Sequence, residues 1–306
     1  MADLKMNIGG IKIKNPVMAA SGTFGFGEEF SKIYNINKLG AIIVKGITLL
    51  PREGNKTPRI AETPSGMLNS IGLQNPGIEA FIKEKIPFLC RFKVPVIVNI
   101  SGYTEEEYVE LAKRLNKEKR ISGIEVNISC PNVKYEGGKL FAQDAKSVYN
   151  ITKNVKKACR HPVIVKLSPE VTDIKIIAKA AEEGGADALS LVNTITGMAI
   201  DINTRKSKIA NITGGLSGPA IKPIGVRCVW QVYNTVKIPI VGMGGILTAD
   251  DAIEYMIAGA SAVAIGTGNF IDPYACLNAV KGIDSYLENK KIKNIKDLVG
   301  KLQTKI

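Results

Sequence analysis

The sequence predicts an α/β protein of the (β/α)8 TIM-barrel class, and three observations carry this prediction. Eight short apolar runs alternate along the chain with eight longer segments in which apolar residues recur at helical spacing. The short runs are apolar at nearly every position, which is typical of parallel strands buried on both faces. Together the eight units span about 270 residues, an ordinary length for such a barrel.

A doubly wound open sheet is the competing architecture. It would usually carry a G-x-G-x-x-G fingerprint directly after its first strand. The segment after the first apolar run reads Ser21-Gly22-Thr23-Phe24-Gly25 and does not match that pattern. The barrel is therefore the favoured prediction.

The predicted elements begin with two short runs, 5–8 and 11–13, on either side of Gly9-Gly10, which indicate an N-terminal β-hairpin. The expected barrel strands are 17–20, 41–44, 95–100, 124–128, 163–167, 188–192, 238–241 and 262–265. The expected helices are 28–36, 78–89, 104–116, 144–158, 172–183, 219–235, 249–258 and 273–287. Cap-forming residues support several helix starts, such as Thr104 ahead of three glutamates.

Three connections that follow barrel strands are long, namely 48–77, 130–143 and 193–218. In a barrel all of them lie on the C-terminal face, where active sites are built. Loops longer than ~12–15 residues are usually functional or disordered. These three contain no low-complexity tract, so we expect ordered walls of an active site. No linker is visible, and we expect a single domain over residues 1–306.

Composition and charge restrict the function. The 306 residues include 41 basic and 28 acidic side chains, a net charge of +13. The lysines are dispersed and not interleaved with aromatics, so we expect no nucleic-acid binding. A mild positive field suits anionic small substrates and a phosphate-bearing cofactor. No apolar run reaches the ~18 residues of a membrane helix, and there is no signal peptide, so we expect a cytoplasmic protein with no membrane attachment.

The five cysteines are too scattered to form a metal site. They are Cys90, Cys130, Cys159, Cys228 and Cys276, and no C-x-x-C pair occurs. We therefore expect no zinc or iron–sulfur ligation and no other metal within this chain. An odd number in a cytosolic chain predicts free thiols.

Polar residues or glycines occupy the C-terminal end of every predicted barrel strand. They are Ser21, Lys45-Gly46, Asn99, Asn127, Lys166, Asn193-Thr194, Gly244-Gly245 and Gly266-Thr267. Each could be an ordinary turn residue, but all of them would face one mouth of the barrel. A polar binding pocket is the better explanation.

The loops after the seventh and eighth strands predict a phosphate site. Gly242 to Gly245 and Gly266 to Gly268 follow these strands, and in such barrels these loops often bind phosphate through backbone N–H groups. Glycine lets the backbone approach an anion closely. Turns without a ligand are the alternative explanation. A third glycine cluster, 214–218, precedes the sixth helix.

Two lysines at strand ends, Lys45 and Lys166, need partners because an isolated ammonium in a dry core is very costly. Schiff-base chemistry is one use for such a lysine. Two of them at one mouth suit stabilisation of an anionic cofactor ring or a carboxylate.

Cys130 is the candidate for proton transfer. It follows the predicted strand 124–128, directly before Pro131, which cannot continue a strand. Asn127 and Asn132 flank it with amide groups. A buried, inert thiol is the alternative. His161, the only histidine, lies at the start of a strand on the opposite end of the barrel, so no Ser-His-Asp triad can form at the mouth.

In combination, these motifs resemble the dihydroorotate dehydrogenases. The matching stretches are 20–25, 45–46, 69–77, 98–101, 126–132, 165–168, 192–194, 214–218, 242–245 and 266–267. The resemblance implies a barrel holding FMN at its mouth, which oxidises (S)-dihydroorotate to orotate in pyrimidine synthesis. A cysteine at the base position implies the soluble type.

The resemblance extends to one form of that type. The segments Ser-Gly-Thr-Phe-Gly and Gly-Leu-Gln-Asn-Pro-Gly resemble those of the NAD-linked form. That form is a catalytic chain paired with an electron-transfer subunit that carries FAD and a [2Fe–2S] cluster. It implies a catalytic homodimer within a heterotetramer.

The resemblance also implies residue roles. Cys130 would remove the C5 proton of dihydroorotate, and FMN N5 would accept the hydride from C6. The implied substrate contacts are Lys45, Asn69, Ser70, Ile71, Gly72, Leu73, Asn127, Asn132, Asn193 and Thr194. The implied FMN contacts are Ser21, Lys45, Gly46, Asn99, Asn127, Lys166, Val192, Gly218, Gly244, Gly245, Gly266 and Thr267.

Three alternatives stay open at this point. A dihydropyrimidine-reducing flavin barrel would share the flavin and the cysteine. A fumarate-using homodimeric dihydroorotate dehydrogenase would need no electron-transfer partner. A phosphate-binding aldolase or isomerase barrel would bind no flavin and would be colourless.

Overall fold

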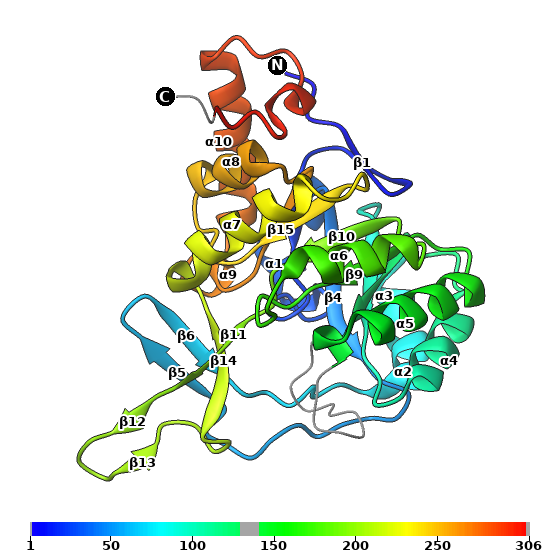
Figure 1. Cartoon of the computed structure of the whole chain (residues 1–306), viewed down its shortest axis with the longest axis vertical. Coiled ribbons are helices and arrows are strands. Elements are labelled where there is room, and N and C mark those ends of the chain that lie inside the picture. Colours follow the sequence, from blue (N-terminus) through cyan, green and yellow to red (C-terminus); the bar gives the residue numbers. More distant parts are fainter. Residues whose placement is uncertain (1, 129–140, 304–306) are drawn as a thin grey trace.

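Eight parallel strands close into a barrel, as the sequence predicted (Figure 1). The computed structural model describes residues 2–128 and 141–303. The strand order around the barrel is β10-β15-β16-β3-β4-β7-β8-β9. The strands are β3 (Val17–Ala19), β4 (Ala41–Ile47), β7 (Val96–Ile100), β8 (Gly123–Asn127), β9 (Val163–Lys166), β10 (Ala188–Leu191), β15 (Ile240–Met243) and β16 (Ala262–Ile265). Closure excludes the doubly wound open sheet.

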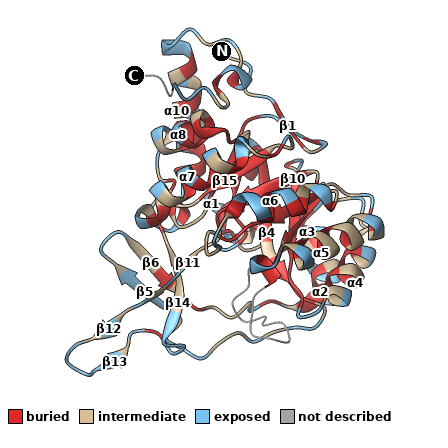
Figure 2. Cartoon of the chain, viewed as in Figure 1, coloured by how far each residue is buried: buried red, intermediate tan, exposed pale blue. Residues whose placement is uncertain are grey.

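Helices cover the outside of the barrel and bury one face against it (Figure 2). They are α1 (Glu28–Ile33), α2 (Gly77–Ala80), α3 (Ile86–Leu89), α4 (Glu105–Leu115), α5 (Ala145–Ala158), α6 (Ile174–Glu183), α7 (Lys222–Tyr233), α8 (Ala249–Ala258), α9 (Gly268–Ile271) and α10 (Ala275–Asn289). Single helical turns are η1 (Ile36–Lys38), η3 (Phe141–Gln143), η4 (Pro219–Ile221) and η5 (Ile295–Leu298), with a π-helical turn at η2 (Phe81–Lys85).

Helix α4 shows how the sequence specifies these helices. Thr104 caps it by accepting a hydrogen bond from the Glu107 backbone N–H. The buried residues Tyr108, Leu111 and Leu115 recur at helical spacing and form the face toward the barrel. No helix in the described part of the chain is both long and apolar enough to cross a membrane.

Two predicted helices are interrupted. The helix expected at 28–36 ends at Ile33 because Tyr34 is extended, and Asn35 then caps the separate turn η1. The helix expected at 78–89 is divided into α2, η2 and α3. Pro87 lies in the first turn of α3 and has no N–H to donate, which interrupts the hydrogen bonding of a continuous helix.

The predicted N-terminal hairpin is confirmed, as β1 (Met6–Ile8) paired with β2 (Ile11–Ile13). Gly9 and Gly10 make its turn with φ angles of 57° and 100°, a left-handed backbone that glycine adopts easily. A Cβ at Gly9 would lie 2.5 Å from the Asp187 carbonyl oxygen. The hairpin therefore packs tightly at the N-terminal end of β10.

A second sheet projects from the barrel (Figure 1), and the sequence did not predict it. Its antiparallel strands are β5 (Ile60–Thr63), β6 (Gly66–Asn69), β11 (Ile195–Met198) and β14 (Thr213–Ser217), in the order β11-β14-β6-β5. A small ribbon, β12 (Ile200–Asp201) with β13 (Lys206–Ser207), extends beyond it. Two of the long connections thus contribute the strands of this sheet, and most of the glycine cluster at 214–218 lies in strand β14.

Candidate functional site

A buried polar cluster lies in the barrel near the C-terminal strand ends. It consists of Asn99 from β7, Glu125 from β8, Lys166 from β9 and Ser190 from β10, and we call these four residues the polar floor. Glu125 is its centre: it accepts a 2.5 Å hydrogen bond from Asn99 Nδ2 and a 2.8 Å bond from Ser190 Oγ. All four side chains are buried, Glu125 completely at 0% exposure.

Lys166 has the partners that its burial requires. Its Nζ lies 3.9 Å from Glu125 Oε2 and donates a long, 3.5 Å hydrogen bond to Ser21 Oγ. A buried charge without an opposite charge is strongly disfavoured. The Glu125 carboxylate therefore allows the Lys166 ammonium to be buried near the barrel mouth.

Lys45 differs from Lys166. It lies near the end of β4, and its Nζ has no hydrogen bond or ion pair within residues 2–128 and 141–303. Burial lowers the pKa of Lys45, and the positive charge of Arg59 lowers it further. An ammonium in this state has a strong preference for an anionic ligand.

Asn127, Asn193 and Thr194 form a linked group beside the polar floor. Asn193 Nδ2 donates to Asn127 Oδ1 at 3.4 Å, and the Thr194 backbone N–H donates to Asn193 Oδ1 at 2.8 Å. The Tyr108 hydroxyl, from α4, donates to the Asn127 carbonyl at 2.8 Å. Amides held in this way can present both donors and acceptors to a polar heterocycle.

The segment from Asn69 to Leu73 begins at the last residue of β6, and the second sheet connects it to Thr194. Asn69 Nδ2 donates to the Gly215 carbonyl at 3.3 Å across the second sheet. A Cβ at Gly215 would lie 2.2 Å from Thr194 Oγ1, so this sheet holds residue 69 and residue 194 close together. Asn55 Nδ2 donates to the Ser70 carbonyl at 3.0 Å.

The remaining residues of that segment have special backbone geometry. Gly72 and Leu73 have φ angles of 74° and 56°. Ile71 is held from outside the segment, because its carbonyl accepts from the Asn55 backbone N–H at 3.0 Å. The turn therefore has a defined shape before any ligand arrives.

The glycine loop after β15 is closely packed, whereas the loop after β16 has space beside Gly266. Gly244 and Gly245 have φ angles of 121° and 71°. Around Gly266 the nearest atom to an added Cβ is Ala20 Cβ, at 3.8 Å. Thr267 Oγ1 donates to Ser217 Oγ at 2.7 Å, which joins this loop to the end of β14 beside Gly218. Space above glycine backbone fits the phosphate group of a ligand.

The structure also gives contacts for two other predicted site residues, Val192 and Gly46. Val192 follows β10, and its backbone N–H donates to the Met243 carbonyl at 2.9 Å. Gly46 lies against Asn99, since an added Cβ would come within 2.7 Å of Asn99 Oδ1. Cys130 and Asn132 lie outside the described residues. Their roles stay predictions.

His161 lies at the opposite end of the barrel from this site. Its Nε2 is 3.1 Å from the Leu115 carbonyl, and burial lowers its pKa. Within the described ranges, no group of three or more His, Cys, Asp or Glu side chains could hold a metal ion.

Comparison with known proteins gives the family. A family model described as Dihydroorotate dehydrogenase matches residues 3–287. The chain belongs to the dihydroorotate dehydrogenase family. A relative from Geotalea uraniireducens is 55% identical over 302 residues, covering 99% of both chains. One from Caldicellulosiruptor bescii is 57% identical over 300 residues, covering 98% of this chain and 99% of the relative. Both are named dihydroorotate dehydrogenase B (NAD(+)), catalytic subunit.

A solved dihydroorotate dehydrogenase shares the fold. The crystal structure of the enzyme from Eimeria tenella in complex with ferulenol has a TM-score of 0.82 and 25% identity to this chain. The similarity covers 98% of this chain and 88% of the other. The predicted resemblance to the dihydroorotate dehydrogenases is thus confirmed.

Two residues of the polar floor, Glu125 and Ser190, are not among the site residues predicted from the sequence, because both lie within predicted strands. A charged residue inside a strand expected to be buried on both faces was the available signal. Tyr255 of α8 donates to the Gly244 carbonyl at 2.7 Å and so holds a glycine loop. No local pattern marks it.

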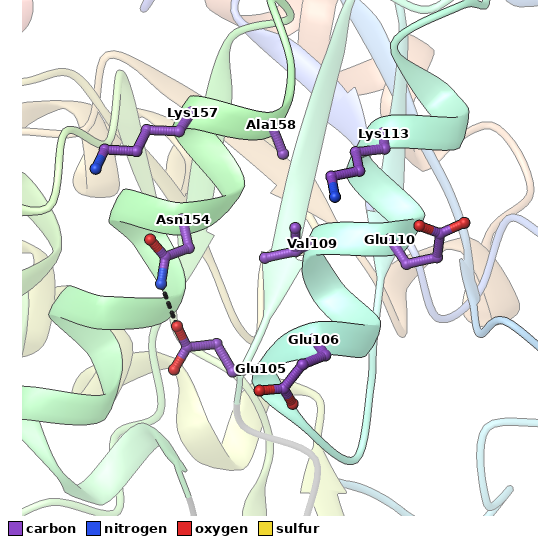
Figure 3. A pocket seen from close by; sticks show the side chains of 8 residues that line it. All are labelled: Glu105, Glu106, Val109, Glu110, Lys113, Asn154, Lys157 and Ala158. Atoms are coloured by element: carbon purple, nitrogen blue, oxygen red, sulfur yellow. Dashed lines mark hydrogen bonds between the residues drawn. The ribbon is translucent and has the colours of Figure 1, made fainter.

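A surface groove between α4 and α5 lies outside this site (Figure 3). It is lined by Glu105, Glu106, Val109, Glu110, Lys113, Asn154, Lys157 and Ala158. Asn154 donates a hydrogen bond to Glu105 across it. Carboxylates and lysines both line the groove, and none of its residues belongs to the predicted site, so it carries no functional assignment.

Proposed function

We propose that this chain oxidises (S)-dihydroorotate to orotate in pyrimidine synthesis, as the catalytic subunit of an NAD-linked dihydroorotate dehydrogenase. The observation that carries this proposal is the similarity to catalytic subunits of that name, 55% and 57% identical over nearly the full chain. The site agrees with it, since the buried Lys166, the half-buried Lys45 and several oriented amides surround one barrel mouth.

The cofactor of the proposed reaction is FMN, one per chain. When bound, FMN supplies the acceptor for the hydride that leaves C6 of the substrate. The proposed phosphate contacts are Gly218, Gly244, Gly245 and Gly266, and the space beside the Gly266 backbone, where the nearest atom to an added Cβ is 3.8 Å away, supports this placement. The other proposed contacts are Ser21, Lys45, Gly46, Asn99, Asn127, Lys166, Val192 and Thr267. Lys166 would place a positive charge where the ring gains electrons.

The protein groups have distinct tasks in this proposal. Cys130 takes the C5 proton as a general base. Lys45 binds the substrate carboxylate, which its lack of a partner in the described structure and its lowered pKa favour. Amides and backbone groups bind the heterocycle, namely Asn69, Ser70, Ile71, Gly72, Leu73, Asn127, Asn132, Asn193 and Thr194.

The proposed route for the electrons leaves this chain. A partner subunit carrying FAD and a [2Fe–2S] cluster would take them to NAD+, in a heterotetramer built on a catalytic homodimer. The words "catalytic subunit" in the relatives' names support a second subunit in those enzymes.

The decisive experiment is spectroscopic. The purified chain should show flavin absorption, and anaerobic addition of dihydroorotate should bleach it while orotate forms in equal amount. A colourless protein that takes up no FMN would contradict the proposal. Bleaching by a dihydropyrimidine that lacks the carboxylate, with none by dihydroorotate, would favour the dihydropyrimidine-reducing alternative.

A further inference from the structure

The polar floor contains an unusual pair of charges. Among the buried side chains of residues 2–128 and 141–303, Glu125 is the only carboxylate and Lys166 the only ammonium. They come from neighbouring strands, and Nζ lies 3.9 Å from Oε2. Burying a charge pair usually contributes less to stability than apolar residues of the same volume would. We therefore expect the Glu125–Lys166 pair to have a role beyond folding.

Glu125 also determines which way the Asn99 amide faces. An ionised carboxylate can only accept hydrogen bonds, so the Asn99 NH2 group must point toward Oε2, 2.5 Å away. A flipped amide would place two acceptor oxygens against each other. In the observed orientation Oδ1 lies on the side of Gly46, where an added Cβ would come within 2.7 Å. Asn99 therefore keeps an acceptor facing the end of β4.

We propose that Glu125 is a positioning residue that balances the charge of Lys166 and fixes the Asn99 amide beneath the cofactor ring. This inference rests on the proposed flavin function. Lys166 alone would strongly favour the electron-rich, reduced flavin. The nearby carboxylate offsets part of that field. The reduced cofactor then stays ready to give its electrons to the next carrier.

The midpoint potential of the bound flavin tests the charge balance. Glu125→Gln keeps the shape and removes the charge, so the potential should shift to a more positive value. Glu125→Asp should restore it toward the wild-type value. Ser190→Ala removes one hydrogen bond to Glu125 but keeps the carboxylate, so its shift should be much smaller. An unchanged potential in a flavin-loaded Glu125→Gln variant would overturn the inference.

Affinity for FMN tests the orientation of Asn99. A glutamine at position 125 can donate as well as accept, so it no longer selects one orientation of the amide. FMN binding should weaken by roughly 5–20-fold, the effect of about one misplaced hydrogen bond. Thr152→Val is the matched control, since it removes another fully buried polar group, far from the mouth in α5. Equal FMN affinity for Glu125→Gln and the wild type would contradict this part.

A double-variant cycle on the full chain covers the case in which Glu125→Gln binds no flavin. Leaving Lys166 unpaired should lower the melting temperature by on the order of 10 °C. Adding Lys166→Met to Glu125→Gln removes both charges and should recover most of that loss. Strictly additive effects would overturn the pairing. If the wild-type chain itself binds no FMN, the proposed function fails, while this cycle still tests the pair.

Discussion

At the scale of single residues, the lowered pKa of Lys45 predicts how substrate binding depends on pH. Its folded pKa is lowered, so it loses its proton at a lower pH than an ordinary lysine does. Orotate carries a carboxylate, and its affinity should therefore fall as pH rises through this lowered pKa. Spectral titration with orotate between about pH 6 and about pH 10 measures this decline.

The Lys45→Arg variant tests whether Lys45, and not another titratable group, causes the pH dependence of orotate binding. It stays protonated over the whole range, so Lys45→Arg should show weak but nearly pH-independent affinity. Lys12→Arg, on the exposed face of the N-terminal hairpin, is the control and should behave as the wild type. The same decline in Lys45→Arg and the wild type would assign the effect to another group.

Cys130 carries the second residue-scale prediction. Cys130→Ala should leave FMN bound and slow dihydroorotate oxidation by ~10²–10⁴-fold, the usual effect of removing a general base. Cys130→Ser should recover activity only at high pH, since a hydroxyl is a much weaker acid than a thiol. Steady-state assays with an artificial dye acceptor measure this. Cys90→Ala makes the same change at an exposed thiol and should keep full activity; a Cys130→Ala variant equally active at neutral pH would refute the assignment.

At the scale of elements, the contact between helix α8 and the loop after β15 leads to a prediction about FMN affinity. The Tyr255 hydroxyl donates to the carbonyls of Gly244 at 2.7 Å and Met243 at 3.3 Å. Burial raises the pKa of Tyr255, so the hydroxyl remains a donor at every working pH. Tyr255→Phe should leave the Gly244 carbonyl without this donor and weaken FMN binding about tenfold, or ~1.4 kcal/mol.

Fluorescence titration of FMN measures that loss of affinity. Tyr34→Phe is a matched control, because the Tyr34 hydroxyl is buried and has no hydrogen-bond partner among the described residues. Removing it should leave FMN affinity unchanged and should not lower stability. Equal affinities in both variants would show that the loop after β15 does not depend on α8.

The second sheet shows where element prediction failed. Its strands have four or five residues, and β14 contains two adjacent glycines. The pairing joins residues far apart in the chain, such as Asn69 and Gly215, separated by 146 positions. Such pairing has no local signature, because each strand is stabilised only by its partner. The barrel strands were predictable since burial on both faces left an apolar run in each.

At the scale of the whole molecule, the proposed division of labour predicts that this chain alone does not reduce NAD+. No dinucleotide-binding fingerprint follows its first strand, and its cysteines are too dispersed for an iron–sulfur cluster. The isolated chain should reduce artificial dyes with dihydroorotate and form NADH only after a FAD and [2Fe–2S] subunit is added. Measuring NADH with rigorously purified chain, with and without that subunit, gives the answer.

Two results would contradict this arrangement. Rapid NADH formation without a partner would place the complete electron route in this chain. Rapid turnover of the isolated chain with fumarate would favour the fumarate-using homodimer instead. The dye assay on the same preparation is the control, since it shows that the catalytic chain is active in each case.

The sequence by itself determined the barrel, the family and the row of polar residues at the strand ends. The strands and their ends have a local signal, a continuous apolar run followed by one or two polar or glycine residues. The family is recognised from short matching stretches along the chain. The structure places Lys166 and Asn99 in one buried cluster around Glu125, with Asn127 opposite Lys166 in the neighbouring strand, while the roles of these residues remain predictions.

Only the tertiary structure decided which polar groups meet. Glu125 looked like an ordinary strand residue, yet the order of β7, β8, β9 and β10 in the barrel brings it to Asn99, Lys166 and Ser190 from three other strands. Side-chain direction follows from strand order and register, and these depend on long-range hydrogen bonds between strands. The charge balance of the mouth is therefore a property of the closed barrel and not of any one segment.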